Sequence, residues 1–176
     1  MKKLFLVIMT FSLQTPLAFS QSGDLKIGDL TPEIILPGPD GDSISLSSLR
    51  GKIVLIDFWA SWCSPCVKEQ PELADLYRKY KDADFKHGKG FEIYGVSLDS
   101  KRESWKSSIK KLKINWAQVS DLEFWSSPVA RTYNLQKIPA NFLIDSKGNI
   151  IAKDLHGNAL EEFISNLLLT NDLDSR

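Results

Sequence analysis

The chain is poor in cysteine and histidine. Its 176 residues include two cysteines and two histidines, whereas a structural zinc site takes four Cys or His ligands. A second pair of cysteines is missing, and neither His87 nor His156 has a partner at ligand spacing. The sequence therefore argues against a structural zinc site, and it assigns no catalytic role to either histidine.

The chain also lacks an excess of charge of one sign. The 22 Lys and Arg residues balance the 22 Asp and Glu residues, and no basic stripe with interleaved aromatic residues is present, so nucleic acid is not an expected partner. No glycine-rich turn follows a strand at the spacing of dinucleotide-binding folds, so no nicotinamide or flavin cofactor is indicated. A length of 176 residues that are 43% hydrophobic suffices for one folded domain.

The N-terminus lacks a hydrophobic run long enough to span a membrane. The apolar stretch 4–13 is interrupted at Gln14, well short of the roughly 20 residues that a spanning helix needs. A short cationic start precedes this stretch and the small residues of Ala18-Phe19-Ser20 follow it, which is the pattern of a cleaved secretory signal. We therefore predict a signal peptide at 1–20 and a single domain at 21–176, with an uncleaved membrane anchor as the alternative.

The two cysteines form the main chemical motif. Cys63 and Cys66 follow an apolar, β-branched run over 52–59, which predicts a strand buried on both faces. Apolar residues then recur at helical spacing over 73–80. The dithiol is therefore predicted to lie on a strand-to-helix turn, where it can close and open a disulfide.

This turn predicts different roles for the two thiols. Pro65 suits the first turn of a helix, where its missing N–H leaves no bond unmade. Cys63 would then lie at the helix N-terminus, where free amides and the macrodipole favour a thiolate. We predict that Cys63 is the nucleophile and Cys66 the sheltered resolving thiol, with the redox-active Cys63–Cys66 disulfide in place of any separate cofactor.

The rest of the chain alternates strand and helix patterns. Hairpin signals flank the turn-rich segments 37–41 and 145–148. Further strands and helices are predicted at 91–98, 105–112, 116–119, 127–133 and 160–168. A βαβ crossover followed by a hairpin and a closing helix predicts an α/β fold, with a mixed central sheet flanked by helices.

The order of these elements resembles thioredoxin. The run 62–66 (Trp-Cys-Ser-Pro-Cys) opens the main helix, and Ile138-Pro139 precedes the last hairpin. The leading hairpin, the export signal and the extra segment 115–133 make the chain similar to the TlpA-like and ResA-like extracytoplasmic thioredoxins over roughly 25–169. The resemblance implies a thioredoxin fold with an N-terminal β-hairpin extension and an inserted strand-helix segment. It also implies thiol:disulfide oxidoreductase activity.

Two carboxylates match positions of this family. Asp57 stands where thioredoxins keep a buried aspartate behind the dithiol, and Glu69 matches the active-site glutamate of the ResA-like branch. Asp57 is a mild departure from that branch, where an uncharged residue can occupy the position. A carboxylate inside an apolar strand loses solvation in its charged form, so its pKa rises toward the range of a general base. We predict that Asp57 and Glu69 take the proton of Cys66, and that their titrations couple if both lie near the dithiol.

The predicted substrate contacts surround Cys63. Trp62 would form part of an apolar docking surface beside the reactive sulfur. Pro139 matches the cis-proline of the family, and a cis bond there would expose the backbone of Ile138 to pair with a substrate chain. The residues predicted to contact substrate are Trp62, Ser64, Pro65, Ile138 and Pro139.

The resemblance and the export signal together predict a function. We expect an extracytoplasmic oxidoreductase, periplasmic or otherwise exported, that reduces disulfides of exported proteins such as apocytochrome c. A membrane thiol carrier would supply its electrons. No histidine stands between the cysteines, which favours a reductant, since such a histidine stabilises the reduced form of strongly oxidising relatives.

Other functions stay open at this stage. A copper-binding thioredoxin-like chaperone would need His156 placed over Cys63. A disulfide donor or isomerase would use the same dithiol, and a peroxiredoxin-type peroxidase shares the fold, although its Thr-x-x-Cys motif is missing here. A purely structural disulfide would gain little stability from so short a loop. The sequence leaves the oligomeric state and the role of residues 117–133 undecided.

Overall fold

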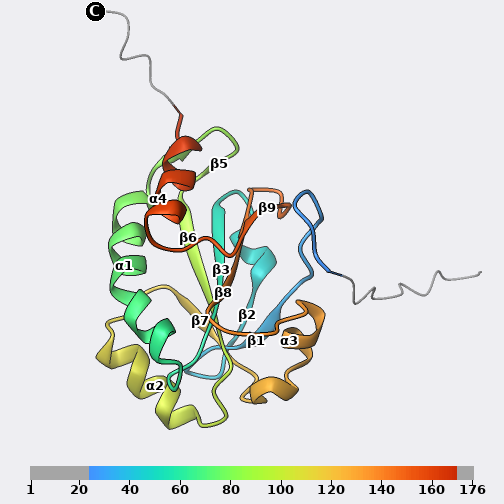
Figure 1. Ribbon diagram of the computed structural model, residues 1–176, viewed down its shortest axis with the longest axis vertical. Coiled ribbons are helices and arrows are strands. Elements are labelled where there is room, and N and C mark those ends of the chain that lie inside the picture. Colours follow the sequence, from blue (N-terminus) through green and yellow to red (C-terminus); the bar gives the residue numbers. More distant parts are fainter. Residues whose placement is uncertain (1–23, 170–176) are drawn as a thin grey trace, which may run out of the picture.

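A five-stranded mixed sheet forms the centre of the computed structural model, which describes residues 24–169 (Figure 1). Its strand order is β7-β6-β3-β8-β9. β3, β6 and β7 run parallel, whereas β8 and β9 are antiparallel to their neighbours. The strands are β3 (Ile53–Trp59), β6 (Phe91–Ser97), β7 (Ala117–Val119), β8 (Ala140–Ile144) and β9 (Ile150–Lys153). The predicted mixed α/β architecture is confirmed.

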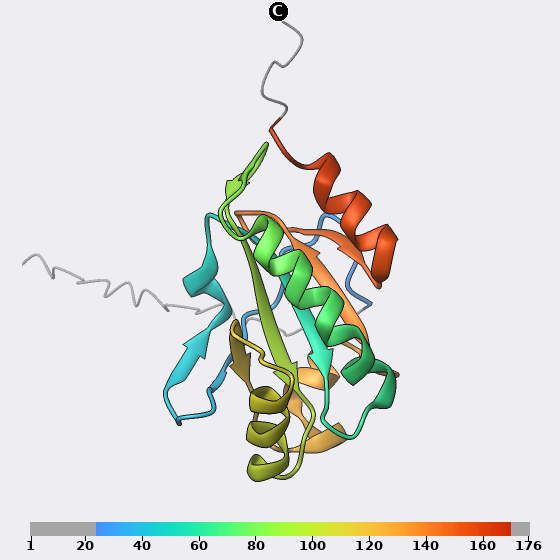
Figure 2. The same cartoon turned by 90° about the vertical axis from the view of Figure 1, so that its left-hand side faces the viewer.

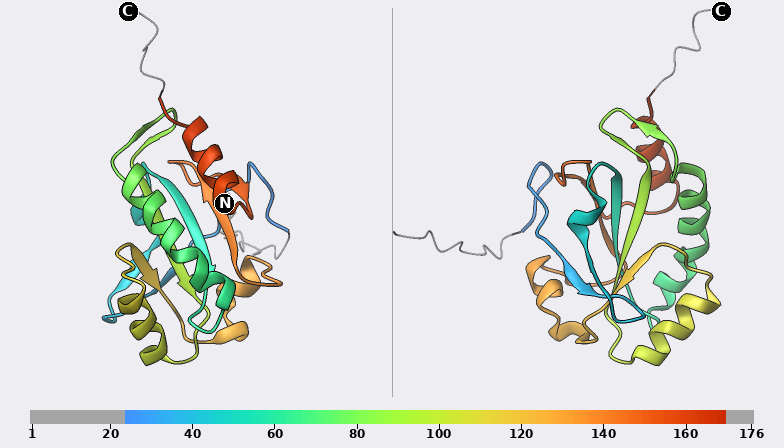
Figure 3. Two further views of the ribbon diagram at one scale, coloured as in Figure 1. Left: turned by 60° about the vertical axis from the view of Figure 1, so that its left-hand side comes forward. Right: turned by 180° about the vertical axis from the view of Figure 1, so that it is seen from behind.

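Helices cover one face of the sheet, and an N-terminal hairpin covers the other (Figures 2 and 3). The first face packs against α1 (Ser64–Tyr80), α2 (Arg102–Lys111) and α4 (Gly157–Asn166). The second packs against β1 (Ile35–Pro37), β2 (Ser43–Ser45) and the 3-10 helix η1 (Leu46–Leu49). The inserted segment contains β7, the 3-10 helix η2 (Phe124–Ser126) and α3 (Pro128–Thr132). Both predicted additions to the core fold are therefore present.

β3 is buried on both faces because its side chains alternate between two apolar layers. Leu55 and Trp59 belong to the layer beneath the helices, whereas Ile56 and Phe58 belong to the layer beneath the hairpin. By the same alternation the side chain of Asp57 faces the helices. The apolar run that surrounds it therefore brings a carboxylate into the core against α1.

One region differs from its prediction. A small hairpin, β4 (Asp84–Phe85) and β5 (Gly88–Lys89), lies in the segment 81–90 that was predicted to be a loop. Phe85 anchors it, since this side chain is 3% exposed and its backbone forms a bridge to Leu168. Strands of two residues are too short to give a periodic pattern, so the sequence does not reveal them.

The prediction of a signal peptide at 1–20, and of a membrane anchor as its alternative, falls outside the described residues. Within residues 24–169, none of the helices combines the length and the apolar character that a bilayer crossing demands.

Candidate active site

The dithiol lies at the N-terminus of α1. Cys63 is the N-cap residue, with extended backbone angles, and its Sγ accepts a hydrogen bond from the Cys66 amide at 3.3 Å. The two sulfurs form a disulfide. Cys63 is 6% exposed and Cys66 1%, so Cys63 is the more accessible sulfur. An amide donor and the positive end of the helix dipole both favour a thiolate at Cys63 once the bond is reduced.

A buried network fixes the turn that precedes Cys63. The carboxylate of Asp99, just after β6, accepts hydrogen bonds from the Ser61 amide at 2.9 Å and the Ser61 hydroxyl at 2.5 Å. The Ser97 hydroxyl donates a third, at 2.7 Å. Asp99 is 1% exposed, so these donors replace the water that a buried carboxyl group loses. The network ties the end of β6 to the loop that carries Trp62 and Cys63.

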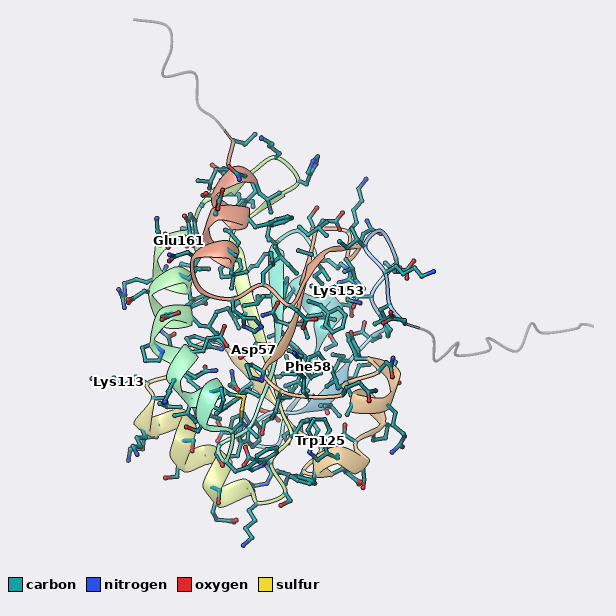
Figure 4. The ribbon with its side chains drawn as sticks, viewed as in Figure 1. Asp57, Phe58, Lys113, Trp125, Lys153 and Glu161 are labelled. Atoms are coloured by element: carbon teal, nitrogen blue, oxygen red, sulfur yellow. A yellow bond between two sulfur atoms is a disulfide. The ribbon has the colours of Figure 1, made fainter. Side chains whose placement is uncertain are left out.

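Asp57 lies inside the protein, on the α1 face of β3. The side-chain amide of Gln70 donates a hydrogen bond to its Oδ2 at 3.2 Å. Desolvation raises the pKa of Asp57 from 3.8 to about 7, and the nearby charge of Glu69 adds to this, whereas Gln70 and His156 act in the opposite direction. In Figure 4, Asp57 lies at the centre of the molecule and the yellow Cys63–Cys66 bond at the start of α1. A carboxyl group with this pKa exchanges a proton near neutral pH.

Glu69 forms a pair that sequence reasoning missed. Its Oε1 lies 2.7 Å from Nδ1 of His156, at the start of α4, although 87 positions separate the two residues. Its side chain is 13% exposed, so it is not the solvated surface charge that its place beside Lys68 also allows. The sequence gives His156 no partner, because no local spacing signals a contact made by two distant helices. The structure shows that His156 does have a partner, which is Glu69.

The backbone near Pro139 adjoins the dithiol turn. The Ile138–Pro139 peptide bond is cis, as the resemblance implies. β8 pairs with β3 up to Phe58 and Ala140, so Pro139 lies at the end of the sheet from which the Cys63 turn departs. Ile138 is half-buried between the two core layers. Ser64 and Pro65 are exposed at the start of α1.

Exposed aromatic rings continue this surface. The ring of Phe124, from η2, lies 5.1 Å from that of Trp62 between centroids, and 6.3 Å from that of Trp125. Trp62 is 47% exposed and Phe124 42%. We call Trp62, Phe124 and the half-buried Trp125 the aromatic patch. Large exposed apolar side chains that adjoin one another are typical of interaction sites.

The loop that carries Phe124 is held in a costly conformation. Leu122 and Phe124 have positive φ angles of 61° and 54°, which are rare for bulky residues. The carboxylate of Asp121 holds the loop, since it accepts hydrogen bonds from the Glu123 amide at 3.1 Å and the Ser127 hydroxyl at 2.6 Å. The inserted segment thus presents Phe124 beside Trp62 in a fixed geometry.

The described residues give the dithiol no third metal ligand. Within residues 24–169 no group of three or more His, Cys, Asp or Glu side chains is arranged to hold a metal ion. The ring of His156 contacts Glu69. The structure thus places His156 against Glu69, whereas the copper-chaperone alternative requires it over Cys63.

Comparison with known proteins agrees with this geometry. The model of the AhpC/TSA family matches residues 27–153. The chain belongs to this family. The thiol-disulfide oxidoreductase ResA of Bacillus cereus is 31% identical over 135 residues, which cover 77% of this chain and 73% of the relative. ResA of Bacillus subtilis is 30% identical over 146 residues, which cover 83% of this chain and 76% of the relative.

Solved structures extend the comparison. The thioredoxin domain of a thiol-disulfide oxidoreductase from Bacteroides vulgatus is 36% identical, with a TM-score of 0.75, and the match covers 83% of this chain and all of that domain. A thiol:disulfide interchange protein from a Bacteroides species is 35% identical, with a TM-score of 0.75, over 86% of this chain and 96% of its own. The chain is thus a thiol-disulfide oxidoreductase with a thioredoxin-like fold, and the predicted resemblance to ResA-like proteins is confirmed.

Proposed function

We propose that this AhpC/TSA-family protein is an extracytoplasmic reductant of disulfides in exported proteins. The observation that carries the proposal is the asymmetry of the dithiol, with Cys63 at the helix N-terminus and Cys66 fully buried. Apocytochrome c cysteines are the proposed substrate class, and a membrane thiol carrier the proposed electron donor. The ResA relatives and the secretory pattern of residues 1–20 support this choice.

In the proposed first step, the thiolate of Cys63 attacks a disulfide of the substrate. A bond forms between Cys63 Sγ and one substrate sulfur, and the other substrate sulfur leaves as a thiolate. The helix N-terminus and the Cys66 amide stabilise the attacking thiolate. The substrate backbone would pair with Ile138 beside Pro139, while Ser64 and Pro65 border the approach.

In the proposed second step, Cys66 resolves the mixed disulfide. Its thiol must first lose a proton, and it is too buried to give that proton directly to water. Asp57 and Glu69 are the proposed acceptors. Asp57, with a pKa of about 7, can take a proton at neutral pH, and Glu69 lies close enough for its charge to act on Asp57. Cys66 Sγ then bonds to Cys63 Sγ, and the second substrate sulfur leaves. The protein dithiol is oxidised by two electrons and the substrate disulfide is reduced to two thiols.

The reduction potential of the Cys63–Cys66 pair tests the direction of this reaction. We expect a value near or below about −270 mV, the potential of thioredoxin, when protein lacking residues 1–20 is equilibrated with a dithiothreitol series. A value near about −120 mV would make the protein a disulfide donor or isomerase and would overturn the proposal. Rapid peroxide turnover by the reduced protein would favour the peroxidase alternative.

The aromatic patch predicts how a protein substrate docks. Replacing Phe124 by alanine should lower kcat/KM for a protein disulfide about tenfold, because the patch loses an exposed ring worth about 1.4 kcal/mol on contact. The rate with a small aromatic disulfide should stay within about twofold, since so small a reagent needs only Cys63. Stopped-flow kinetics with both substrates would check the difference.

A matched control for Phe124 is available before β1. Leu30 is 65% exposed and its backbone bridges Asn149, in the turn between β8 and β9 at the end of the sheet opposite the Cys63 turn, so Leu30→Ala removes a similar apolar group away from the patch. It should leave both rates unchanged. Equal losses with both substrates in Phe124→Ala would mean that the ring supports Cys63 rather than the substrate.

A further inference from the structure

A clamp on β8 fixes the segment that leads to His156. The side chain of Asn141 binds the backbone of Leu155 twice: its amide donates to the Leu155 carbonyl at 2.7 Å, and its oxygen accepts from the Leu155 amide at 3.1 Å. Asn141 is the sheet partner of Asp57. The residue next to His156 is therefore held from the strand that adjoins the buried carboxylate.

His156 and Asn141 close a ring of polar contacts. The His156 ring contacts Glu69 at 2.7 Å, and Gln70, the next residue of α1, donates to Asp57 at 3.2 Å. The ring thus runs from Asp57 through α1 to His156 and returns through the Asn141 clamp. Each link spans two elements of the fold, so the position of His156 depends on the same strands and helix that position Asp57.

Exposure rises in steps along this ring. Asp57 is 3% exposed, the side chain of Glu69 13%, and that of His156 38%. A groove of about 530 Å³ between α1 and α4 has Glu69 on its wall, together with Gly157, the residue after His156. Solvent therefore reaches the Glu69–His156 pair but not Asp57, so this pair lies between the buried carboxylate and water.

Several other groups share this environment. On β6 and β8 the neighbours of Asp57 are Gly95 and Asn141, which carry no titratable side chain. Lys79 of α1 and Glu161 of α4 pair with each other at 2.7 Å. The remaining acidic groups along the groove are Glu72 and Asp75 of α1, and Asp154 lies two residues before His156. These groups are acidic, whereas His156 in its protonated form is a cation that contacts Glu69.

We propose that His156 is a positioning residue for the resolving step, which holds Glu69 in place through the 2.7 Å contact and, in its protonated form, supplies a positive charge that keeps the carboxylates able to accept the Cys66 proton. Cys66 gives its proton to the carboxylate pair, its sulfur bonds to Cys63, and the substrate sulfur leaves as a thiolate. The proton then passes from the pair to solvent on the His156 side. This inference rests on the proposed role of Asp57 and Glu69 as the proton acceptors.

Single-turnover oxidation by one equivalent of 5,5′-dithiobis(2-nitrobenzoate) separates the two steps. Attack by Cys63 releases a first coloured thiolate, and resolution by Cys66 releases a second. The rate of the second release would be measured from about pH 5 to about pH 9 in stopped flow. The reagent replaces the unidentified substrate, so the result does not depend on the proposed compartment, donor or direction.

The expected result is a displaced pH profile. In wild type the second release should rise with a midpoint near the pKa of Asp57, about 7. His156→Gln removes the charge and keeps a polar side chain, so the midpoint should move up by about 0.5 to 1 pH unit, because loss of a nearby opposite charge raises a carboxyl pKa. The first release should be unaffected. His87→Gln is the matched control, since His87 is exposed and has no assigned role, and it should leave the profile unchanged.

Glu69→Gln provides the test of mechanism. Removing its negative charge should move the midpoint down, because that charge raises the pKa of Asp57. If His156 acts through Glu69, His156→Gln should shift the midpoint less in the Glu69→Gln background than in wild type.

Three negative outcomes show which proposal fails. An unchanged midpoint in His156→Gln, with a uniformly lower rate or a lower stability, would leave His156 with only a structural role and overturn this inference. If Asp57→Asn and Glu69→Gln both keep the wild-type profile, the proposed proton acceptors are wrong and the failure lies in the proposed function itself. A profile that Asp57→Asn abolishes and His156→Gln leaves in place would overturn the His156 inference alone.

Discussion

Asp57→Asn should stabilise the oxidised protein at pH 8 by about 4 kcal/mol. Burial raises the pKa of Asp57 from 3.8 to about 7, a difference of about 3 pH units at about 1.4 kcal/mol each. At pH 8 the folded wild-type chain holds a charged carboxylate in its core, where the loss of hydration makes that charge unfavourable. Asparagine carries no charge. Urea unfolding of both proteins would measure the difference.

The sign of the pH dependence follows from proton binding. Between about pH 4 and about pH 7 the folded chain keeps a proton on Asp57 that the unfolded chain has lost. The stability that this proton contributes is complete below about pH 4 and disappears as the pH rises through about 7. The two proteins should therefore be nearly equal in stability at pH 4 and should diverge above it. A wild-type chain that gains stability over Asp57→Asn as the pH rises would contradict the burial argument.

A second buried aspartate gives the matched control. Asp99 is as buried as Asp57, but its carboxylate accepts three hydrogen bonds, from Ser61 and Ser97. Asp99→Asn replaces one acceptor oxygen by a donor that faces other donors, so it should destabilise the protein at pH 8. Opposite signs for the same substitution at two buried sites would tie the Asp57 result to its single donor, Gln70, rather than to charge removal in general.

The sequence predicted the parts of the site that depend on neighbours along the chain. Cys63 lies at a helix N-terminus because a β-branched run ends just before it and Pro65 starts a helix just after it. Asp57 is buried because it stands inside an apolar strand. Local physics decides both positions, and the order of strands and helices follows from the same periodic patterns.

The contacts that the sequence did not predict join distant segments. Glu69 and His156 are 87 positions apart, and Asn141 and Leu155 meet only because β8 begins beside the segment before α4. Side-chain pairing of this kind depends on how α4 packs on α1, which no local pattern encodes. The exposure of Phe124 has the same origin, since it depends on a loop held at positive φ by the carboxylate of Asp121. Sequence reasoning therefore located the dithiol and the buried carboxyl group of Asp57 but missed the groups around them.

Cys66→Ser should convert the enzyme into a trap for its substrates. Cys63 would still attack, because its place at the N-terminus of α1 does not depend on the second sulfur, but no thiol would remain to resolve the adduct. Turnover should fall by about 10³-fold or more, and a mixed disulfide with the substrate should accumulate on non-reducing gels and disappear with dithiothreitol. Cys63→Ser should lose the same activity without forming any adduct, since Cys66 is buried and cannot reach a protein substrate. Full turnover by Cys66→Ser would mean that one thiol suffices and that the buried carboxylates serve some step other than the deprotonation of Cys66.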